Sequence, residues 1–211
     1  MQTSLIRVLA ALALIAVASC SGTSGNPYAA IQNPPLLQAR LHTVTLATDS
    51  ANAAEALQVK GYQASQFASN YPVSNSVEAT LWGVPLPAVE GVTHFRSPNA
   101  ADPGVRVVKM AMAARGSKPD AKVEKAFFRN VLGSDVPQWP AGIERNDGIR
   151  VQVWTFVISD VMAANKSLRE NGVPVVFDPV SITTAYLGDH KTMAIRAPDG
   201  AIVELVQTAA Q

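Results

Sequence analysis

The sequence predicts an α+β protein built from two copies of one β-α-β-β-β unit. Three observations support this fold class. A complete unit can be followed from Val151 to Gln207, a fainter copy precedes it, and residues 38–211 suffice for one well-buried domain.

The second unit is predicted at about residues 149–208. Its first strand, VQVWTFV, ends before Ser159-Asp160, residue types that accept hydrogen bonds from the free N–H groups of a helix start. Apolar residues then recur at helical spacing in VMAANKSLRENG, where Gly172 is typical of a helix end. Three β-rich runs follow, and Pro-Asp-Gly forms a turn between the last two.

Matches at constant offsets predict the first unit at about residues 39–113. At an offset of 111 they pair Asp49 with Asp160, Ala53 with Ala164, Leu57 with Leu168 and Gly61 with Gly172. At offsets of 100 and 96 they pair Arg96 and Pro98 with Arg196 and Pro198, and Gly104–Val108 with Gly200–Glu204. The predicted strands lie near 40–48, 77–83, 91–97 and 105–112, with a helix near 50–60.

The two units are joined by a predicted helix at about residues 118–132. Its apolar stripe is formed by Val123, Ala126, Phe127 and Val131. The Pro-punctuated run VPQWPAG continues the connection. Within the first unit, the polar stretch at 62–76 is predicted to be irregular.

The N-terminal segment, residues 1–19, is predicted to be a signal peptide. Arg7 precedes an apolar run that is short for a membrane span. The run ends in Val-Ala-Ser-Cys20, which is similar to the lipobox of bacterial lipoproteins. This similarity implies lipidation of Cys20 and a lipid-anchored, periplasm-facing protein of the bacterial cell envelope. The alternative is an ordinary secretory signal with an incidental cysteine.

The composition of the chain indicates a tether after the signal peptide and restricts the partners and cross-links that the protein can have. Residues 20–37, rich in Ser, Gly, Asn and Pro, predict a flexible tether. Without residues 1–19 the chain keeps 16 basic and 16 acidic residues, a balance that argues against nucleic-acid binding and electrostatic membrane attachment. Cys20 is the only cysteine, so stability depends on packing and not on an internal disulfide.

The second unit resembles the vicinal oxygen chelate superfamily of glyoxalases, bleomycin-resistance proteins and extradiol dioxygenases. The residues that carry the resemblance are Ser159-Asp160, Leu168 with Gly172, and the run APDG followed by VEL. The resemblance implies that two βαβββ modules pair their sheets into a cup-shaped half-barrel. Alternation predicts that Trp154, Phe156 and Ile158 face the helix, and that Val153, Thr155 and Val157 face the cup. A generic α+β sandwich without a cavity is the alternative.

In metal-dependent members, ligands for a divalent metal ion come from the first and fourth strands of each module. Glu204 occupies the fourth-strand position and is either a catalytic metal ligand or an acid held by ordinary hydrogen bonds. His42 has the first-strand spacing, seven residues before Asp49, but alternation turns Thr43 towards the cup instead. A one-residue bulge could satisfy both patterns.

The other two ligand positions hold Val153 and Val108, which cannot bind a metal. With Thr155, these valines are predicted to contact a substrate. For the remaining histidines, His94 and His190, a surface role is favoured over an unusual metal site.

Further candidates have structural alternatives. Arg96 and Arg196 either bind an anionic substrate or tie down the neighbouring turn, and the second role is favoured. The three tryptophans are predicted to be core or interface residues; they are Trp82, Trp139 and Trp154.

The function predicted is a cup that binds a small organic molecule. One alternative is a divalent-metal-dependent lyase, isomerase or dioxygenase. The other is a metal-free ligand-binding or sequestering protein of the bleomycin-resistance type. A structural envelope role is a third. Two complete units favour an intramolecular cup, in a monomer or a homodimer.

Overall fold

A computed structural model describes residues 26–31, 34–48, 52–65, 89–110, 120–140, 143, 149–184 and 186–208. The predicted signal peptide, Cys20, Trp82 and the strand predicted at 77–83 lie outside the described residues. Within the described ranges, no helix has both the length and the apolar character needed to cross a membrane.

The elements described in each half follow the predicted order. The first module contains β1 (Arg40–Thr48), α1 (Asn52–Val59), β2 (Gln63–Ala64), β3 (Val89–Arg96) and β4 (Gly104–Met110). The second contains β5 (Ile149–Val157), α4 (Val161–Glu170), β6 (Val175–Thr184), β7 (Gly188–Arg196) and β8 (Ile202–Thr208). Between them, α3 (Ala121–Ala126) continues into the π-helical turn η2 (Phe127–Leu132), at the predicted position of the connecting helix.

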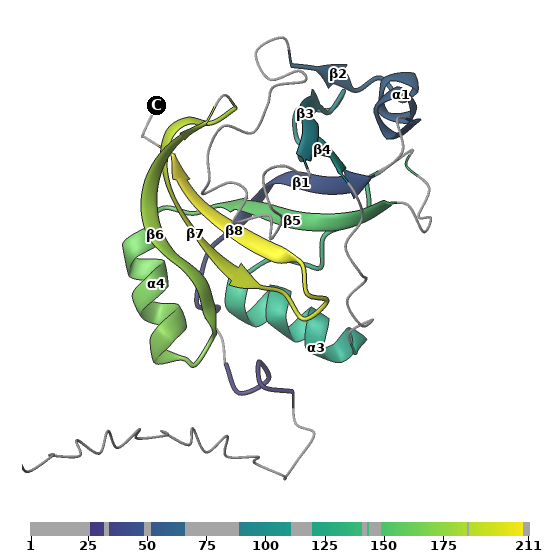
Figure 1. The fold of residues 1–211 in the computed structure, drawn as a ribbon. Helices are drawn as coiled ribbons and strands as arrows, with labels where there is room; N and C mark the ends of the chain where they lie inside the picture. The colour runs from purple at the N-terminus through teal and green to yellow at the C-terminus, as the bar shows by residue number, and fades with distance from the viewer. Residues whose placement is uncertain are drawn as a thin grey trace, which may run out of the picture.

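All eight strands form one curved sheet in the order β2-β3-β4-β1-β5-β8-β7-β6 (Figure 1). The first strands of the modules, β1 and β5, are antiparallel neighbours at its centre. On either side, β4 runs parallel to β1, and β8 runs parallel to β5. The predicted fold class, α+β with two βαβββ modules joined into a cupped, open sheet, is therefore confirmed.

The first module differs from prediction around its second strand. Residues 62–76 were predicted to be irregular, but Gln63 and Ala64 form β2 and pair with Arg96 and Phe95 of β3. The two-residue strand is too short to produce a recognisable β pattern in the sequence, because alternation needs four residues or more.

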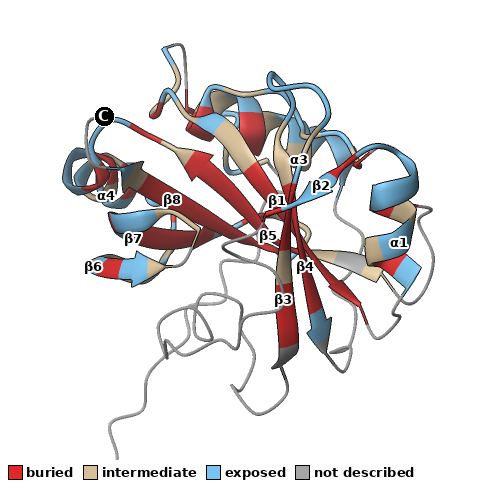
Figure 2. Cartoon of the chain, turned by 90° about the horizontal axis from the view of Figure 1, so that it is seen from above, coloured by how far each residue is buried: buried red, intermediate tan, exposed pale blue. Residues whose placement is uncertain are grey.

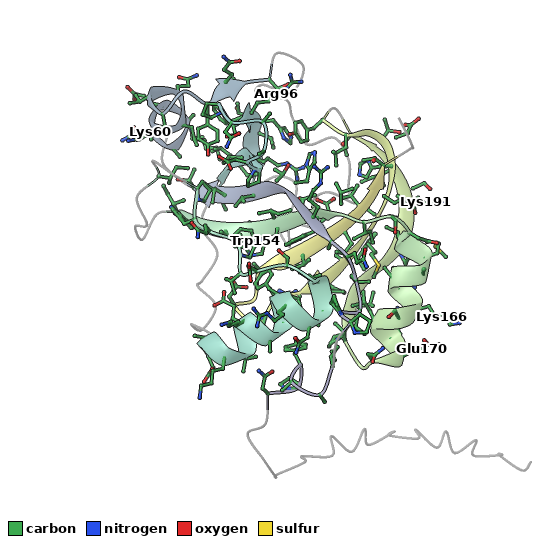
Figure 3. The ribbon with its side chains drawn as sticks, turned by 180° about the vertical axis from the view of Figure 1, so that it is seen from behind. Lys60, Arg96, Trp154, Lys166, Glu170 and Lys191 are labelled. Carbon is green, nitrogen blue, oxygen red and sulfur yellow. The ribbon has the colours of Figure 1, made fainter. Side chains whose placement is uncertain are left out.

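The core lies between one face of the sheet and the helices. Alternate strand residues such as Trp154, Phe156 and Leu205 are buried there with Leu57 of α1 and Leu168 of α4 (Figure 2). The predicted helix-facing set, Trp154, Phe156 and Ile158, lies in this core. Figure 3 shows Trp154 on the side of the sheet that carries α3, and its ring meets that of Phe128 edge to face at 6.3 Å.

The turn η2 buries two adjacent pairs of apolar residues, Phe127-Phe128 and Val131-Leu132. A π-helical turn has more residues than an α-helical one, so it presents a wider apolar stripe than the predicted one. The turn ends at Gly133, whose φ of 70° favours glycine. A Cβ there would lie only 2.5 Å from the Leu37 carbonyl oxygen.

The segment before β1 is partly docked on η2. The Leu37 N–H donates to the Val131 carbonyl at 2.9 Å, and the Asn130 side chain donates to the Tyr28 carbonyl at 2.9 Å. Ile31 and Leu37 are buried in the core. The prediction of a flexible tether over 20–37 therefore does not hold for the described part of this segment, because its apolar residues pack on the domain.

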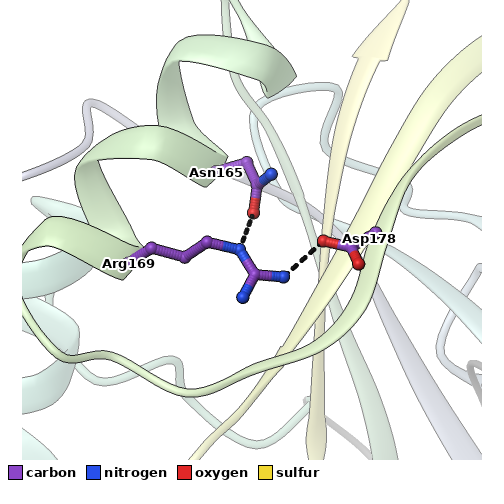
Figure 4. Close-up of polar contacts among 3 residues, drawn as sticks. All are labelled: Asn165, Arg169 and Asp178. Atoms are coloured by element: carbon purple, nitrogen blue, oxygen red, sulfur yellow. Dashed lines mark hydrogen bonds and ion pairs between the residues drawn. The ribbon is translucent and has the colours of Figure 1, made fainter.

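Helix α4 is fixed at both ends. The Asp160 carboxylate accepts hydrogen bonds from the backbone N–H groups of Met162 and Ala163, at 2.8 and 3.0 Å. Near the other end, the Arg169 guanidinium bonds Asn165 on the same helix and Asp178 on β6 (Figure 4). The cap thus satisfies N–H groups that no helical carbonyl can reach.

We expect Asp160→Ala to lower the free energy of unfolding by about 1 kcal/mol, because two N–H groups of α4 lose their acceptor. Urea denaturation followed by circular dichroism measures the change. Asp160→Ser, which keeps a capping oxygen, should recover most of the loss. Equal destabilisation by both substitutions would contradict the capping role.

Candidate functional site

The face of the sheet opposite the core, here called the cup face, buries a set of polar side chains. Residues on this face alternate with the core residues of each strand. Its buried polar members are Thr43, Thr45, His94, Arg106, Thr155, His190, Thr192 and Glu204. Polar groups inside buried strands are costly unless they are hydrogen-bonded, so this set needs a chemical explanation.

Glu204 is the buried acid of the cup face and is only 3% exposed. The Thr155 hydroxyl donates to Oε2 at 2.8 Å, and the Thr192 hydroxyl donates to Oε1 at 3.3 Å. Thr155 and Glu204 are directly paired across β5 and β8, as their predicted positions in the cup require. Both carboxylate oxygens thus have a hydroxyl donor, in line with the interpretation of an acid held by hydrogen bonds.

His42 is the extra residue of a bulge in β1. Leu41 pairs with Phe156 and Thr43 pairs with Thr155, so His42 has no partner of its own on β5. The bulge brings the two candidate side chains together, because the His42 ring nitrogen Nδ1 lies 2.7 Å from the hydroxyl of the cup residue Thr43.

Charge and burial keep His42 neutral near pH 7. Burial lowers the pKa of its ring below the usual value, and the positive charges of Arg106 and Arg40 lower it further. The Glu204 carboxylate acts in the opposite direction on the same pKa. His42 therefore lies within the electrostatic range of Glu204, although no described contact joins them.

The strand register corrects one sequence correspondence. Thr45 pairs with Val153 across the centre of the sheet, Thr45 pairs with Arg106, and Val153 pairs with Ile202. These pairs make Arg106 of β4 the counterpart of Ile202 of β8, which agrees with the predicted offset of 96. They also make Thr45, and not His42, the counterpart of Val153. The offset of 111 fits the buried helix residues Ala53 with Ala164 and Leu57 with Leu168, and it fails on β1, where the register pairs Thr45 with Val153.

The ligand positions implied by the resemblance do not fit a metal centre. By the register, they hold Thr45 and Val153 on the first strands and Val108 and Glu204 on the fourth strands. Only Glu204 is a usual ligand, whereas catalytic zinc sites typically have three. Among the described residues, no three His, Cys, Asp or Glu side chains are grouped so as to hold a metal ion.

Two cup-face residues were missed in the sequence. Arg106 is 3% exposed and lies between His94 on β3 and Thr45 on β1. Arg106 could have been recognised as a charged residue among the valines of GVRVV, in the same way that Glu204 was recognised as an acid in an apolar strand. Tyr186, before β7, gave no comparable signal, because a tyrosine near a turn is common at protein surfaces.

Tyr186 connects the second module to the histidines of the first. Its ring stacks on His94 with centroids 3.8 Å apart and meets His42 edge to face at 5.6 Å. Gly104 leaves room for this contact, because a Cβ there would lie 3.0 Å from the Tyr186 hydroxyl oxygen. The tip between β6 and β7 thus packs against the cup face of the first module.

The predicted surface role of His94 and His190 is wrong, because both rings are buried. Burial strongly lowers the pKa of His94, and the charge of Arg106 and the His42 ring lower it further. The His190 Nδ1–H donates to the Gly188 carbonyl at 2.8 Å, while its Nε2 is buried without a hydrogen-bond partner. Neither position could be recognised from one sequence, because both lie near strand ends.

The remaining candidates have structural roles. The Arg196 guanidinium donates to the Gly200 carbonyl at 2.9 Å, which confirms the turn-stabilising role, and Arg96 is exposed. Trp154 belongs to the core, and the Trp139 indole donates to the Ile143 carbonyl at 2.6 Å.

Comparison with solved structures finds proteins of similar fold. Methylmalonyl-CoA epimerase from Mycobacterium tuberculosis is 16% identical over 85% of this chain and 93% of its own, with a TM-score of 0.48. The Mn(II)-bound glyoxalase from Novosphingobium aromaticivorans is 12% identical over 81% and 39%, with a TM-score of 0.43. A glyoxalase/bleomycin resistance protein/dioxygenase superfamily member from Vibrio splendidus 12B01 is 10% identical over 81% and 99%, with a TM-score of 0.38.

No protein-family model and no curated protein matches the sequence. Identities of 10–16% transfer no residue roles, so the chemistry of the site follows from its own side chains.

Proposed function

We propose that this chain binds a small organic molecule on its cup face through protein side chains, without a metal ion. The observation that carries the proposal is the buried polar set that crosses the joint between the modules: Arg106 on β4, Thr45 on β1, Thr155 on β5 and Glu204 on β8. Small-molecule sites place a few polar groups on an otherwise apolar surface, and this face combines them with Val108 and Val153.

A metal-dependent lyase, isomerase or dioxygenase is the second candidate. The observation in its favour is the electrostatic influence of Glu204 on His42, which places one acid and one neutral imidazole on the same side of the sheet. Two donors are fewer than a catalytic site usually has. In addition, Thr155 and Thr192 already occupy part of the hydrogen-bonding capacity of the Glu204 carboxylate.

Thermal-shift screening of aromatic and hydrophobic compounds in the presence of EDTA tests the first candidate. A ligand at 100 times its dissociation constant adds about 2.7 kcal/mol to the stability of the folded state, which raises the melting temperature by roughly 5–11 °C. We expect the same shift after EDTA is replaced by zinc, nickel, manganese or iron. A shift that needs one of these metals, and that His42→Ala and Glu204→Ala abolish, would support the metal-dependent enzyme instead.

We also propose that the protein is a lipoprotein of the bacterial cell envelope, anchored through Cys20. The support is the run Val-Ala-Ser-Cys20 after a short apolar segment, which lies outside the described residues. Cys20→Ser should move the protein from the membrane fraction to the soluble fraction and remove the mass of the acyl chains. Membrane association that persists in Cys20→Ser would contradict this anchor.

A further inference from the structure

The exposed side of the connecting helix is basic. Between residues 122 and 132 the exposed side chains are Lys122, Lys125 and Arg129, and their spacing of three and four residues places them on one side of the helix. The other side is buried in the core through residues such as Phe127 and Val131. The three basic residues, here called the basic stripe, therefore face solvent.

The acidic residues of the described stretch 120–140 lie away from the basic stripe. The Asp120 carboxylate precedes the helix and accepts hydrogen bonds from two N–H groups of the first turn. Glu124 is half-buried and lies about 200° around the helix from Lys122, at about 100° for each residue. Asp135 follows Gly133, where the helix has ended. The exposed side of the helix thus presents positive charge.

The chain that precedes β1 is docked along the same helix. The Asn26 side chain donates to the Lys122 carbonyl oxygen at 3.0 Å. The Tyr28 ring meets the Phe127 ring edge to face, with centroids 5.1 Å apart. Figures 1 and 3 show the first described residues on the same side of the sheet as α3. The N-terminal segment is therefore fixed beside the basic stripe.

The proposed lipid anchor lies a short way before this docked segment. Cys20 precedes Asn26 by six residues, and a chain of this length spans at most about 21 Å, at about 3.5 Å per residue. The stripe itself is about 10 Å long, because Arg129 follows Lys122 by seven residues at about 1.5 Å each. Acyl chains on Cys20 therefore keep the basic stripe close to the lipid surface.

Anionic headgroups suit a basic stripe that is held this close. The negative potential of a lipid surface extends over about one Debye length, about 8 Å at physiological ionic strength. Each lysine or arginine that enters this layer favours the contact about fivefold. The balanced total charge of the chain argues against attachment by charge alone. Here the anchor supplies the attachment, and the stripe determines which side of the domain faces the lipid.

We propose that the basic stripe of α3 and η2 contacts an anionic lipid surface and orients the anchored domain on it. The inference rests on the proposed lipid anchor at Cys20 and names the side of the domain that meets the membrane. Because η2 packs on the core side of the sheet, the cup face on the opposite side then opens away from the membrane. A small molecule reaches the cup face from the aqueous side.

Lysine labelling on vesicles tests this orientation. Protein produced from the full sequence in a bacterial host is purified with its acyl chains and inserted into preformed vesicles of phosphatidylcholine, with or without phosphatidylglycerol. A membrane-impermeant reagent acetylates exposed lysines, and mass spectrometry gives the rate at each one. We expect Lys122 and Lys125 to react at least about tenfold more slowly when phosphatidylglycerol is present. Lys60 and Lys191, exposed on other elements, should react equally on both vesicles (Figure 3).

One variant and one salt condition test the charge. Arg129→Gln keeps both reporter lysines and should reduce their protection about fivefold, because one of the three positive charges is lost. Lys60→Gln removes the same charge at an exposed position outside the stripe, is the matched control and should leave the protection unchanged. At about 1 M salt, where the Debye length is about 3 Å, the protection should disappear in the unmodified sequence as well.

The intact mass of the purified protein separates the possible failures. Acyl chains on Cys20 together with equal reactivity of Lys122 and Lys125 on both kinds of vesicle would overturn the orientation and leave the anchor standing. A mass without acyl chains would overturn the anchor and this inference with it. Protection of the two lysines by soluble polyglutamate, but not by phosphatidylglycerol, would point to an acidic protein partner and overturn the lipid contact.

Discussion

Phe156→Ala is expected to lower the free energy of unfolding by about 3–5 kcal/mol, a loss that would reduce the melting temperature by roughly 6–20 °C. Phe156 is completely buried near the C-terminal end of β5, with Leu41 of β1 and Leu205 of β8 as its neighbours in the sheet. Its ring also lies 6.3 Å from that of Phe128 in η2. The cavity left by alanine would open where both modules and the connecting helix meet, so neighbouring groups cannot collapse into it freely.

Two controls separate the cavity from unspecific effects. Phe156→Leu keeps much of the apolar volume and should be less destabilising than alanine in the same urea denaturation experiment. Val176→Ala removes an apolar group at a position that is 43% exposed, and its effect should stay within about 0.5 kcal/mol. Comparable losses in Phe156→Ala and Val176→Ala would show that the joint between the modules is not the centre of the core.

The architecture could be predicted from local features of the second module. Asp160 begins α4, Gly172 follows its end with a φ of 70°, and the apolar residues of β5 alternate between core and cup. Such signals lie close together in the chain, so one sequence contains them. The first module repeats them imperfectly, and the two-residue strand β2 has no pattern at all.

The polar site was predictable only in part, because its geometry depends on bulges and register. Glu204 could be recognised as an acid inside an apolar strand, and Arg106 carried the same signal. His42 is itself the extra residue of the bulge in β1, and only the pairing of β1 with β5 reveals that bulge. The contact of Tyr186 with His94 joins residues of different modules, and no local pattern encodes it.

The cup face carries buried threonines together with one buried acid, Glu204, and one buried base, Arg106. Its threonines lie on the central strands and on β7, and two of them hold Glu204 in place. Arg106 lies on the other side of the joint, on β4.

The stability of the protein should fall as the pH decreases below about 6.5, the usual pKa of histidine. His94 is completely buried, and burial, the charge of Arg106 and the His42 ring lower its pKa in the folded state. The unfolded chain therefore binds a proton below pH 6.5 that the folded chain does not. The free energy of unfolding should decrease by up to about 1.4 kcal/mol for each pH unit, or roughly 2 kcal/mol between pH 6.5 and 4.5.

Urea denaturation at several pH values between 7.5 and 4.5 measures this dependence, and His94→Gln isolates the contribution of one ring. Glutamine takes up no proton in this range, so the variant should lose most of the slope even if it is less stable at pH 7. The lowered pKa of His42 leaves a smaller slope of the same sign. Parallel profiles for the two proteins would mean that the folded state accommodates a protonated His94. That outcome would require Arg106, on the neighbouring strand, to tolerate a second positive charge in the same buried face.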